Sequence, residues 1–207
     1  MEMSDYKIVG LAGQLTAGKD TAAQALVSEG YKRVAFADKI KELAMEANPL
    51  VTTNVQTVNI GTGAGKMKHV VNGNGGWDQS KDYYPLVREF LVNLGEGARK
   101  VFGEDFWIDQ ALDDVRGDTV VSDVRYENEM LAIRDRGGII IRIDRDNRRP
   151  LGDHETELMS DDRFDGIVVN DGTVGDLQRK VVEMVEGLQS PPKKLIDIEE
   201  LIDDDVR

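Results

Sequence analysis

The chain of 207 residues has the length of one ordinary domain with room for insertions, and it is long enough to bury a substantial core. Its 26 Lys and Arg residues against 39 Asp and Glu residues leave a formal net charge of −13, which argues against a protein that coats nucleic acid or anionic membranes. The chain has no Cys and only two His, which excludes disulfides, iron–sulfur ligation, thiolate zinc and a cysteine nucleophile.

The N-terminal segment does not resemble a signal peptide. Residues 1–6 carry Glu2 and Asp5 where a signal peptide is basic and then apolar, and no apolar run in the chain reaches membrane-spanning length. We therefore expect a protein of a reducing cytoplasm.

The first third of the chain reads as alternating strands and helices. An apolar run over 7–12 predicts a strand, and after a glycine loop the alanine-rich residues 20–27 predict a helix. A second strand is expected over 33–36. Asp38 is then the predicted N-cap of a helix over 39–48, which Pro49 ends.

The middle of the chain is predicted to be an insertion, from about 49 to 103. Residues 51–82 are rich in Gly and Asn, which favours loops that can include a short hairpin. Residues 84–102 place apolar side chains three and four positions apart and predict a long amphipathic helix, in which Gly95 is awkward. A further helix is expected over 105–115.

The second half returns to alternation. The predicted elements are a strand over 119–124, a helix over 127–136, a strand over 139–144, a polar, arginine-bearing segment over about 145–163, a strand over 166–170, and a helix capped by Asp171 or Thr173 that runs to about 188. Near-continuous apolar strands between helices indicate a parallel sheet covered on both faces, in a single α/β domain over 1–190. The acidic tail, 191–207, also has apolar residues, and both a docked helix and a solvated end stay open.

The glycine loop carries the strongest motif. Gly13 to Lys19 matches G-x-x-x-x-G-K between a predicted strand and a predicted helix, which is the context that phosphate binding requires. Glycines let backbone N–H groups turn toward a phosphate, the helix N-terminus adds partial positive charge, and Lys19 supplies a mobile cation. We therefore predict that the loop binds nucleotide phosphates through Gly13, Thr16, Ala17, Gly18, Lys19, Asp20 and Thr21.

The residue after the loop lysine departs from the general motif. Asp20 stands where Ser or Thr usually ligates Mg²⁺, and Thr21 follows it. A carboxylate is also a hard oxygen ligand for Mg²⁺, whereas Thr21 points about 100° away around the helix. We predict that Asp20 faces the magnesium ion. A near-match over 61–66 lacks a strong preceding strand and is interpreted as a flexible loop.

Phosphoryl transfer requires cations around the moving group, and the acidic chain must concentrate its arginines to supply them. The candidates are Arg88, Arg99, Arg125, Arg142, Arg145, Arg148 and Arg149. Arg88 and Arg99 lie eleven positions apart on the long helix, about 16 Å along a straight axis, so they cannot both grip one phosphate.

Further candidates come from acidic and aromatic residues. Asp123 ends a predicted buried strand, where it can hold a magnesium-bound water or cap the following helix, and we favour the first. Trp77 can stack on a base, and Trp107 is interpreted as core. Asp38, Tyr83 and Tyr84 are weaker acceptor candidates, and His154 lacks the partners for zinc.

From about Ile8 to Leu188 the chain resembles the bacteriophage deoxynucleoside monophosphate kinases of the P-loop class. The resemblance rests on the glycine loop with Asp20, Phe36 to Lys41, Gly76 to Asp78, Val87 to Arg99, Gly103 to Trp107, Ser122 to Glu129, His154 to Glu157, and Asn170 to Thr173.

The resemblance implies a core of about five parallel strands and transfer of the ATP γ-phosphoryl group to a deoxynucleoside 5′-monophosphate with Mg²⁺. It implies ATP contacts from residues 13–21, acceptor or transferred-phosphate contacts from Asp38, Arg88, Arg99, Arg125 and Glu157, and a lid over about 145–163. With the candidates argued from the residues themselves, the predicted acceptor site also includes Trp77 and Asp123, and the predicted metal site consists of Asp20 and Asp123. Arg145, Arg148 and Arg149 would close over the site. A phage-encoded protein would act in the host cytoplasm, with small nucleotides as partners and no nucleic-acid polymer or membrane; a homodimer stays open.

Two alternatives remain at this stage. One is a P-loop kinase for another small molecule, such as a ribonucleoside monophosphate, dephospho-coenzyme A or phosphomevalonate. The other is a module that binds nucleotide without turnover, although pure binding scarcely needs the arginines of the lid segment.

Overall fold

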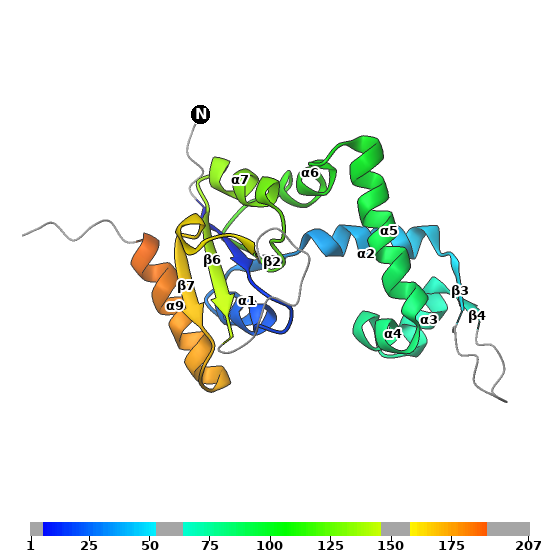
Figure 1. The fold of residues 1–207 in the computed structure, drawn as a ribbon, viewed down its shortest axis with the longest axis horizontal. Helices are drawn as coiled ribbons and strands as arrows, with labels where there is room; N and C mark the ends of the chain where they lie inside the picture. The colour runs from blue at the N-terminus through cyan, green and yellow to red at the C-terminus, as the bar shows by residue number, and fades with distance from the viewer. Residues whose placement is uncertain (1–5, 53–63, 146–157, 190–207) are drawn as a thin grey trace, which may run out of the picture.

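A five-stranded parallel sheet forms the centre of the protein in the computed structural model, which describes residues 6–52, 64–145 and 158–189 (Figure 1). Its strand order is β2-β5-β1-β6-β7, and every neighbouring pair is parallel. The strands are β1 (Ile8–Ala12), β2 (Lys32–Val34), β5 (Thr119–Val121), β6 (Ile139–Asp144) and β7 (Gly166–Val169). This arrangement confirms the predicted parallel α/β fold, with the glycine loop following the central strand β1.

Helices bury both faces of the sheet, which explains why the strands are apolar without alternation. Val9, Val120 and Ile141 pack on one face against α1 (Lys19–Ser28) and α9 (Val174–Gln189). Their chain neighbours Ile8, Val121 and Ile140 pack on the other face against α6 (Phe106–Leu112) and α7 (Glu127–Asp135). All six are at most 1% exposed, and each such side chain contributes about 1.5–3 kcal/mol on burial.

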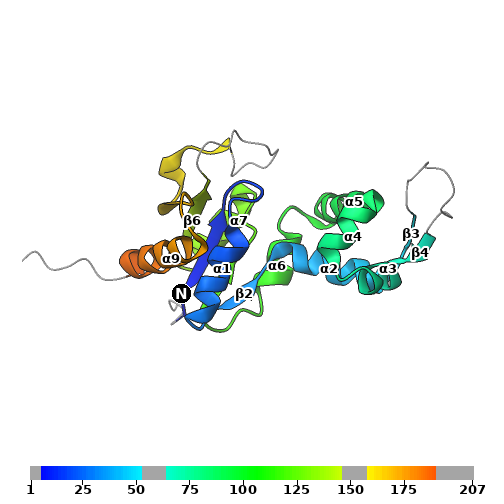
Figure 2. The same ribbon diagram turned by 90° about the horizontal axis from the view of Figure 1, so that it is seen from below.

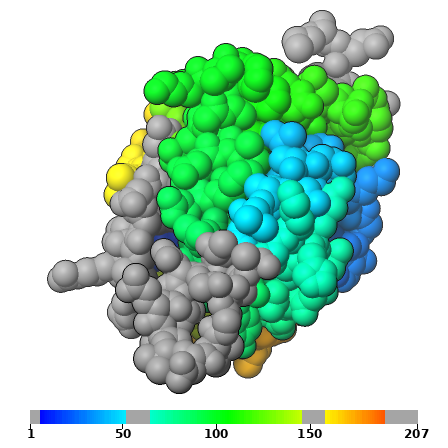
Figure 3. Space-filling view, turned by 90° about the vertical axis from the view of Figure 1, so that its right-hand side faces the viewer, coloured from blue at the N-terminus to red at the C-terminus, as the bar shows by residue number. Residues whose placement is uncertain are grey.

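The predicted insertion projects from the sheet as an arm of helices (Figures 1 and 2). α2 (Phe36–Ala47) and α5 (Pro85–Phe102) pack side by side and carry the hairpin of β3 (Leu50–Thr52) and β4 (Ala64–Lys66), together with α3 (Met67–Gly73) and α4 (Trp77–Tyr83). Figure 3 looks onto the end of this arm, where the green α5 runs beside the cyan residues of α2 and α3. The arm has its own small core of Val51, Met67, Val70, Val71 and Val87.

The packing of α2 against α5 explains why glycine occupies position 95 in the middle of a helix. It lies buried in α5, and a Cβ at its position would lie 3.0 Å from Cδ1 of Ile40 on α2. The missing side chain therefore lets the two helices approach closely, at the usual cost of glycine in a helix.

Several predicted boundaries are wrong. The second strand ends at Val34, because Phe36 starts α2, so Asp38 lies in the first helical turn and Ala35 is the N-cap. The strand expected over 119–124 ends at Val121, and the helix expected over 105–115 covers only Phe106–Leu112.

The interpretation of 51–82 as loops also missed two helices, α3 and α4, although the short hairpin is present. Seven-residue helices have little intrinsic stability, and packing of Met67, Val70 and Val71 in the arm supplies what the local pattern lacks. Residues 61–63 of the near-match motif lie outside the described part, and Ala64–Lys66 form β4.

Part of the lid segment and the tail also lie outside the described residues, which end at Arg145, resume at Leu158 and stop at Gln189. The expectations for Arg148, Arg149, His154, Glu157 and 191–207 therefore stay predictions, as do the domain limits 1–190. After the gap, η1 (Asp161–Arg163) leads into β7. None of the helices within the three described ranges is long and apolar enough to cross a membrane.

Candidate active site

The glycine loop joins β1 to α1, as predicted, and its backbone needs its glycines. Gly13 has φ +130° and Gly18 has φ +109°, in the region that side chains disfavour. A Cβ on Gly13 would lie 2.2 Å from the carbonyl oxygen of Ile143, and one on Gly18 would lie 2.8 Å from Nδ2 of Asn170. Atoms of the sheet and of the loop after β7 thus approach the two glycines too closely for a side chain to fit.

Side chains from distant elements fix the loop from outside. Asn170, at the end of β7, donates from Nδ2 to the carbonyl of Ala17 at 2.8 Å, and Arg145, at the end of β6, donates to the carbonyl of Thr16 at 3.3 Å. The Lys19 ammonium donates to the carbonyls of Gly13 at 2.6 Å and Gln14 at 2.8 Å. Two backbone carbonyls of the glycine loop therefore hold the Lys19 ammonium group against that loop.

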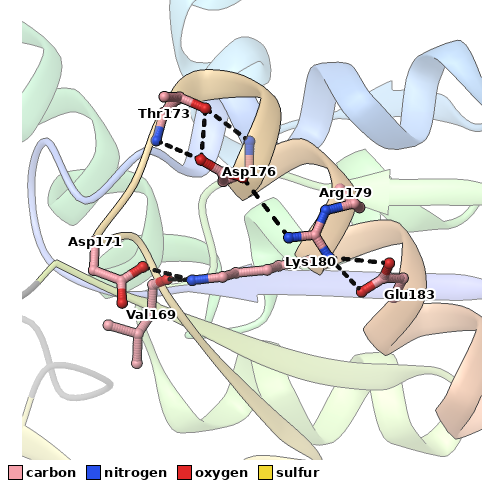
Figure 4. Close-up of polar contacts among 7 residues, drawn as sticks. All are labelled: Val169, Asp171, Thr173, Asp176, Arg179, Lys180 and Glu183. Carbon is pink, nitrogen blue, oxygen red and sulfur yellow. Dashed lines mark hydrogen bonds and ion pairs between the residues drawn. The ribbon is translucent and has the colours of Figure 1, made fainter.

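The turn between β7 and α9 is itself tied down (Figure 4). Thr173 and Asp176 bond reciprocally: the Asp176 N–H donates to Oγ1 of Thr173, and Thr173 donates through N–H and Oγ1 to the Asp176 carboxylate. The hydrogen bonds from Thr173 lower the pKa of Asp176. Thr173 rather than Asp171 therefore caps α9, while Asp171 accepts from Lys180 at 2.5 Å.

The first pocket, which we name the loop pocket, opens above the glycine loop with a volume of about 740 Å³. It is bounded by the loop, the start of α1, the end of β5 and the turn after β7. Among its lining residues are Thr16, Gly18, Lys19, Asp20, Thr21, Asp123, Arg125, Arg145 and Asn170. Eight of these nine were predicted from the sequence, and Asn170 was not.

The second pocket, the helix pocket, has a volume of about 250 Å³ and lies between α2, α5 and the segment that leads into α7. Its wall is partly apolar, with Phe36, Ile40, Leu91, Val92 and Trp107. Its polar side holds Arg88, Arg99, Arg125, Tyr126 and Glu129. An apolar wall beside several guanidinium groups suits a base joined to an anion.

The two pockets adjoin. Ala37, Lys41, Lys81, Asp123 and Arg125 line both of them, and we call these five residues the junction. Three of the five are cationic side chains and one is an acid. An anion held in the helix pocket would therefore meet an anion held in the loop pocket at a cationic wall.

Asp123 at the junction caps the start of α2 and not the following helix. Its Oδ1 accepts the N–H of Phe36 and its Oδ2 accepts the N–H of Ala37, both at 2.9 Å. Desolvation raises the pKa of Asp123 although these two N–H bonds lower it. The carboxylate thus fixes the angle at which the arm leaves the sheet, and it still faces the loop pocket.

Arg88 and Arg99 both line the helix pocket, and their contact with an acceptor or a transferred phosphate stays a prediction. The Arg99 guanidinium lies over the Tyr126 ring, 4.0 Å from its centroid, which orients it while leaving its edge for an anion. Their separation along α5 places them at different parts of one pocket, so the conclusion that they do not share one phosphate stands as a prediction.

Three predicted residues lie elsewhere. Asp38 lines neither pocket; it pairs with Arg33 and Lys41, each at 2.9 Å. Trp77 lines neither pocket and packs against the core of the arm. Arg142 bonds Asp144 and Asp161, which is a structural role.

The weaker aromatic candidates divide in the same way. Tyr83 is 67% exposed, and Tyr84 packs against the core of the arm. Trp107 is buried, as interpreted, and its Nε1 donates to the carbonyl of Gly95 at 2.9 Å, although its ring also borders the helix pocket.

Sequence reasoning missed Lys41, Lys81, Tyr126, Glu129 and Asn170. Glu129 carries a readable signal, because an acid three residues after a helix start accepts backbone N–H groups there. Its Oε2 accepts the N–H of Arg125 at 2.6 Å and that of Tyr126 at 3.1 Å, and the side chain is 4% exposed. Desolvation, with a contribution from the charge of Asp123, raises the pKa of Glu129 to about 7.

This raised pKa makes stability depend on pH. Between the ordinary pKa of 4.5 and about 7, the unfolded chain has already lost the Glu129 proton while the folded chain keeps it. The folded state then binds more protons, so the free energy of unfolding falls as pH rises through that window and levels off above it. The rise in the pKa of Glu129 from 4.5 to about 7 corresponds to a loss of about 3 kcal/mol in the free energy of unfolding across this window.

We expect Glu129→Gln, which keeps an oxygen for the two N–H groups, to remove this dependence. Urea unfolding at pH 5, 6, 7 and 8 measures this dependence. The free energy of unfolding of the variant should rise relative to that of the wild type as the pH is raised to 7. Glu183→Gln, at an exposed acid of α9, is the matched control and should track the wild type. Parallel curves for Glu129→Gln and wild type would contradict the assignment.

Magnesium fits the carboxylates of the loop pocket. Asp20 is exposed in the first turn of α1 and lines the pocket together with Asp123. In the described ranges no group of three or more His, Cys, Asp or Glu is arranged to hold a metal. Mg²⁺ at phosphate sites needs only one or two carboxylates, because phosphate oxygens and waters complete its shell.

Comparisons with known proteins agree with this geometry. The family model for deoxynucleotide monophosphate kinase matches residues 55–181. A protein of Acanthamoeba polyphaga mimivirus, provisionally described as a deoxynucleotide monophosphate kinase, is 29% identical over 196 residues, which cover 86% of this chain and 96% of that protein. This relative is viral, and a bacteriophage source for the chain stays a prediction.

Among solved structures, dephospho-CoA kinase from Campylobacter jejuni aligns over 88% of this chain and 97% of its own, with a TM-score of 0.42 and 16% identity. A likeness of that size carries no functional argument. The family match, which spans more than half of the chain, does: the chain belongs to the deoxynucleotide monophosphate kinase family and is a nucleotide kinase.

Proposed function

We propose that the protein transfers the γ-phosphoryl group of ATP to the 5′-phosphate of a deoxynucleoside monophosphate, giving ADP and the deoxynucleoside diphosphate. The observation that carries the proposal is the junction, where a pocket built on a phosphate-binding loop adjoins a second pocket with an apolar wall and guanidinium groups. Two anions that must exchange a phosphoryl group need this arrangement.

In this reaction the loop pocket binds ATP. Backbone N–H groups of the loop and the N-terminus of α1 point at the phosphates, and Lys19 exchanges its carbonyl partners for phosphate oxygens. Asp20, and Asp123 through a water molecule, would hold Mg²⁺, which would neutralise charge on the phosphates. Arg145 lies at the loop beside Thr16, where it neutralises further charge, and Arg149 is expected to join it.

The helix pocket binds the acceptor. Its base lies against the apolar wall between α2 and α5, and its phosphate meets Arg125 at the junction together with one of Arg88 and Arg99. Trp77, Asp38 and Glu157 were expected to contribute as well. Because Trp77 and Asp38 support the arm and Lys41 rather than the pocket wall, we now assign them indirect roles; Glu157 stays an expectation.

The reaction needs no covalent enzyme intermediate. The acceptor phosphate oxygen is already nucleophilic, so alignment, exclusion of water and charge neutralisation supply the rate. With ATP in the loop pocket and the acceptor in the helix pocket, the attacking oxygen and the γ-phosphorus would face each other across the junction. The side chains there act by position and charge.

Product separation after incubation with Mg-ATP and each mononucleotide, deoxy and ribo, tests the proposal. We expect at least one deoxynucleoside monophosphate to yield its diphosphate together with an equal amount of ADP. Preference for a ribonucleotide, dephospho-coenzyme A or phosphomevalonate would identify another small-molecule kinase. ATP binding without any diphosphate product would indicate a module without turnover.

A further inference from the structure

Two lysines at the junction were not predicted, and they come from different parts of the arm. Lys41 lies in α2, next to the sheet, and Lys81 lies in α4, within the inserted segment. Both line the loop pocket and the helix pocket. Residues that line both pockets are placed to reach a group that moves from one pocket to the other.

Each of these lysines is positioned by an acid one helical turn earlier. Lys41 Nζ lies 2.9 Å from Oδ1 of Asp38, and Lys81 Nζ lies 3.1 Å from Oδ1 of Asp78. The lysine side chains are 24% and 22% exposed, whereas the Asp78 side chain is 96% exposed. Both lysines line the two pockets, while Asp78 also lines the loop pocket and Asp38 lines neither.

Asp38 is in turn held by Arg33, which bonds its other oxygen at 2.9 Å. Desolvation raises the pKa of Asp38, but the hydrogen bonds and charges of Lys41 and Arg33 outweigh it, so the pKa is lowered overall. The carboxylate therefore stays charged and keeps Lys41 in place.

An ammonium group has three N–H donors, and one donor satisfies the carboxylate in each pair. Among the described residues the hydrogen bonds of these two ammonium groups go to the two carboxylates, so two donors of each lysine can serve oxygen ligands in the pockets. The transferred phosphoryl group spreads its charge over three oxygens as it moves, and fixed cations beside it stabilise that state more than either bound substrate.

We propose that Lys41 and Lys81 are catalytic residues that contact the phosphoryl group in transit between the two pockets. The inference rests on the proposed function. It adds two lysines of the arm, one from α2 and one from α4, to Lys19 and the arginines as cations near the transferred phosphoryl group. α4, which carries Lys81, packs on α5, and this packing holds Lys81 at the junction.

A structural role is the competing explanation: the lysines could merely neutralise Asp38, Asp78 and the nearby Asp123. Such a role predicts a lower melting temperature, or weakened binding of each substrate alone. A role in transit predicts a loss confined to turnover and to ligands whose phosphates cross the junction.

The test compares Lys41→Met and Lys81→Met, which keep the apolar stems, with two control lysines. Lys39→Met removes a lysine of α2 that pairs with Glu42 and lines neither pocket, and Lys68→Met removes a lysine of α3 that pairs with Glu46. With the best acceptor from the mononucleotide panel, kcat should fall at least about 10-fold for each junction variant, with KM for ATP and acceptor within about threefold. The controls should keep wild-type kcat.

Binding gives a second measurement that does not depend on turnover. A bisubstrate probe that joins adenosine and a deoxynucleoside through five phosphates should bind about 10-fold more weakly to each junction variant, as measured by calorimetry. ADP alone and the mononucleotide alone should bind as they do to the wild type. Equal loss for ADP and the probe, or unchanged kcat and unchanged probe affinity, would overturn the proposal.

These outcomes distinguish a failure of the proposed function from a failure of the roles of Lys41 and Lys81. A wild type that phosphorylates no nucleotide would refute the proposed function, and the probe titration would still decide whether the lysines meet a phosphate chain between the pockets. A wild type that phosphorylates a mononucleotide while both junction variants match it would refute only the roles of Lys41 and Lys81.

Discussion

Arg125→Ala should lower kcat on the order of 10²-fold or more, the largest effect that we expect from a single side chain. Arg125 lines both pockets, so its guanidinium can bridge donor and acceptor phosphates as charge develops between them. The substitution keeps the backbone N–H that Glu129 holds, so the turn before α7 should survive. Coupled ADP release with Mg-ATP and the preferred mononucleotide measures the loss.

Two variants control this experiment. Arg179→Ala removes an exposed arginine of α9 whose partners are Glu183 and Asp176, and it should leave kcat within experimental error. Arg125→Lys keeps the charge but loses the planar fork, and it should recover only part of the rate. If Arg125→Ala retained kcat within threefold of the wild type, the central position of Arg125 would be wrong.

Gly13→Ala should destabilise the fold on the order of 3 kcal/mol and abolish measurable ATP binding. The new Cβ would meet the carbonyl oxygen of Ile143 at 2.2 Å, and φ of +130° is itself unfavourable for alanine. Because the obstacle is the backbone of a central strand, the loop has to move instead of the obstacle. Urea unfolding and calorimetric titration with ATP measure the two losses.

Gly30→Ala separates the two causes. Gly30 also has a positive φ, +97°, but a Cβ there would meet no atom within 4 Å. This variant should lose only about 1 kcal/mol, and its ATP affinity should be unchanged. Equal destabilisation by the two substitutions would show that backbone conformation, and not the contact with Ile143, dictates glycine in the loop.

Long periodic or continuously apolar segments were predicted well. The strand over Ile139–Asp144 and the helix over Pro85–Phe102 match their predicted ranges closely, because burial on two faces or along one stripe leaves a strong pattern. The glycine loop was equally readable. Its chemistry depends on backbone N–H groups and one lysine, all within a few consecutive residues.

The arm and the helix pocket were much harder to predict from the sequence. α3 and α4 owe their stability to the small core of the arm, so their own residues carry little signal. Lys41 and Lys81 look like ordinary surface lysines in the sequence, and each has an acid three residues before it. Only packing of α2 and α4 against α5 shows that both line the same boundary.

The amino-acid order alone therefore determined the parallel α/β core, the glycine loop between β1 and α1 and the kinship with nucleotide kinases, because these depend on contiguous patterns. The tertiary structure decided which cations meet between the pockets, that Asp123 caps α2, and that Trp77 supports the arm. These features join residues separated by tens of positions. Their meeting depends on the angle at which the arm leaves the sheet, which no local pattern specifies.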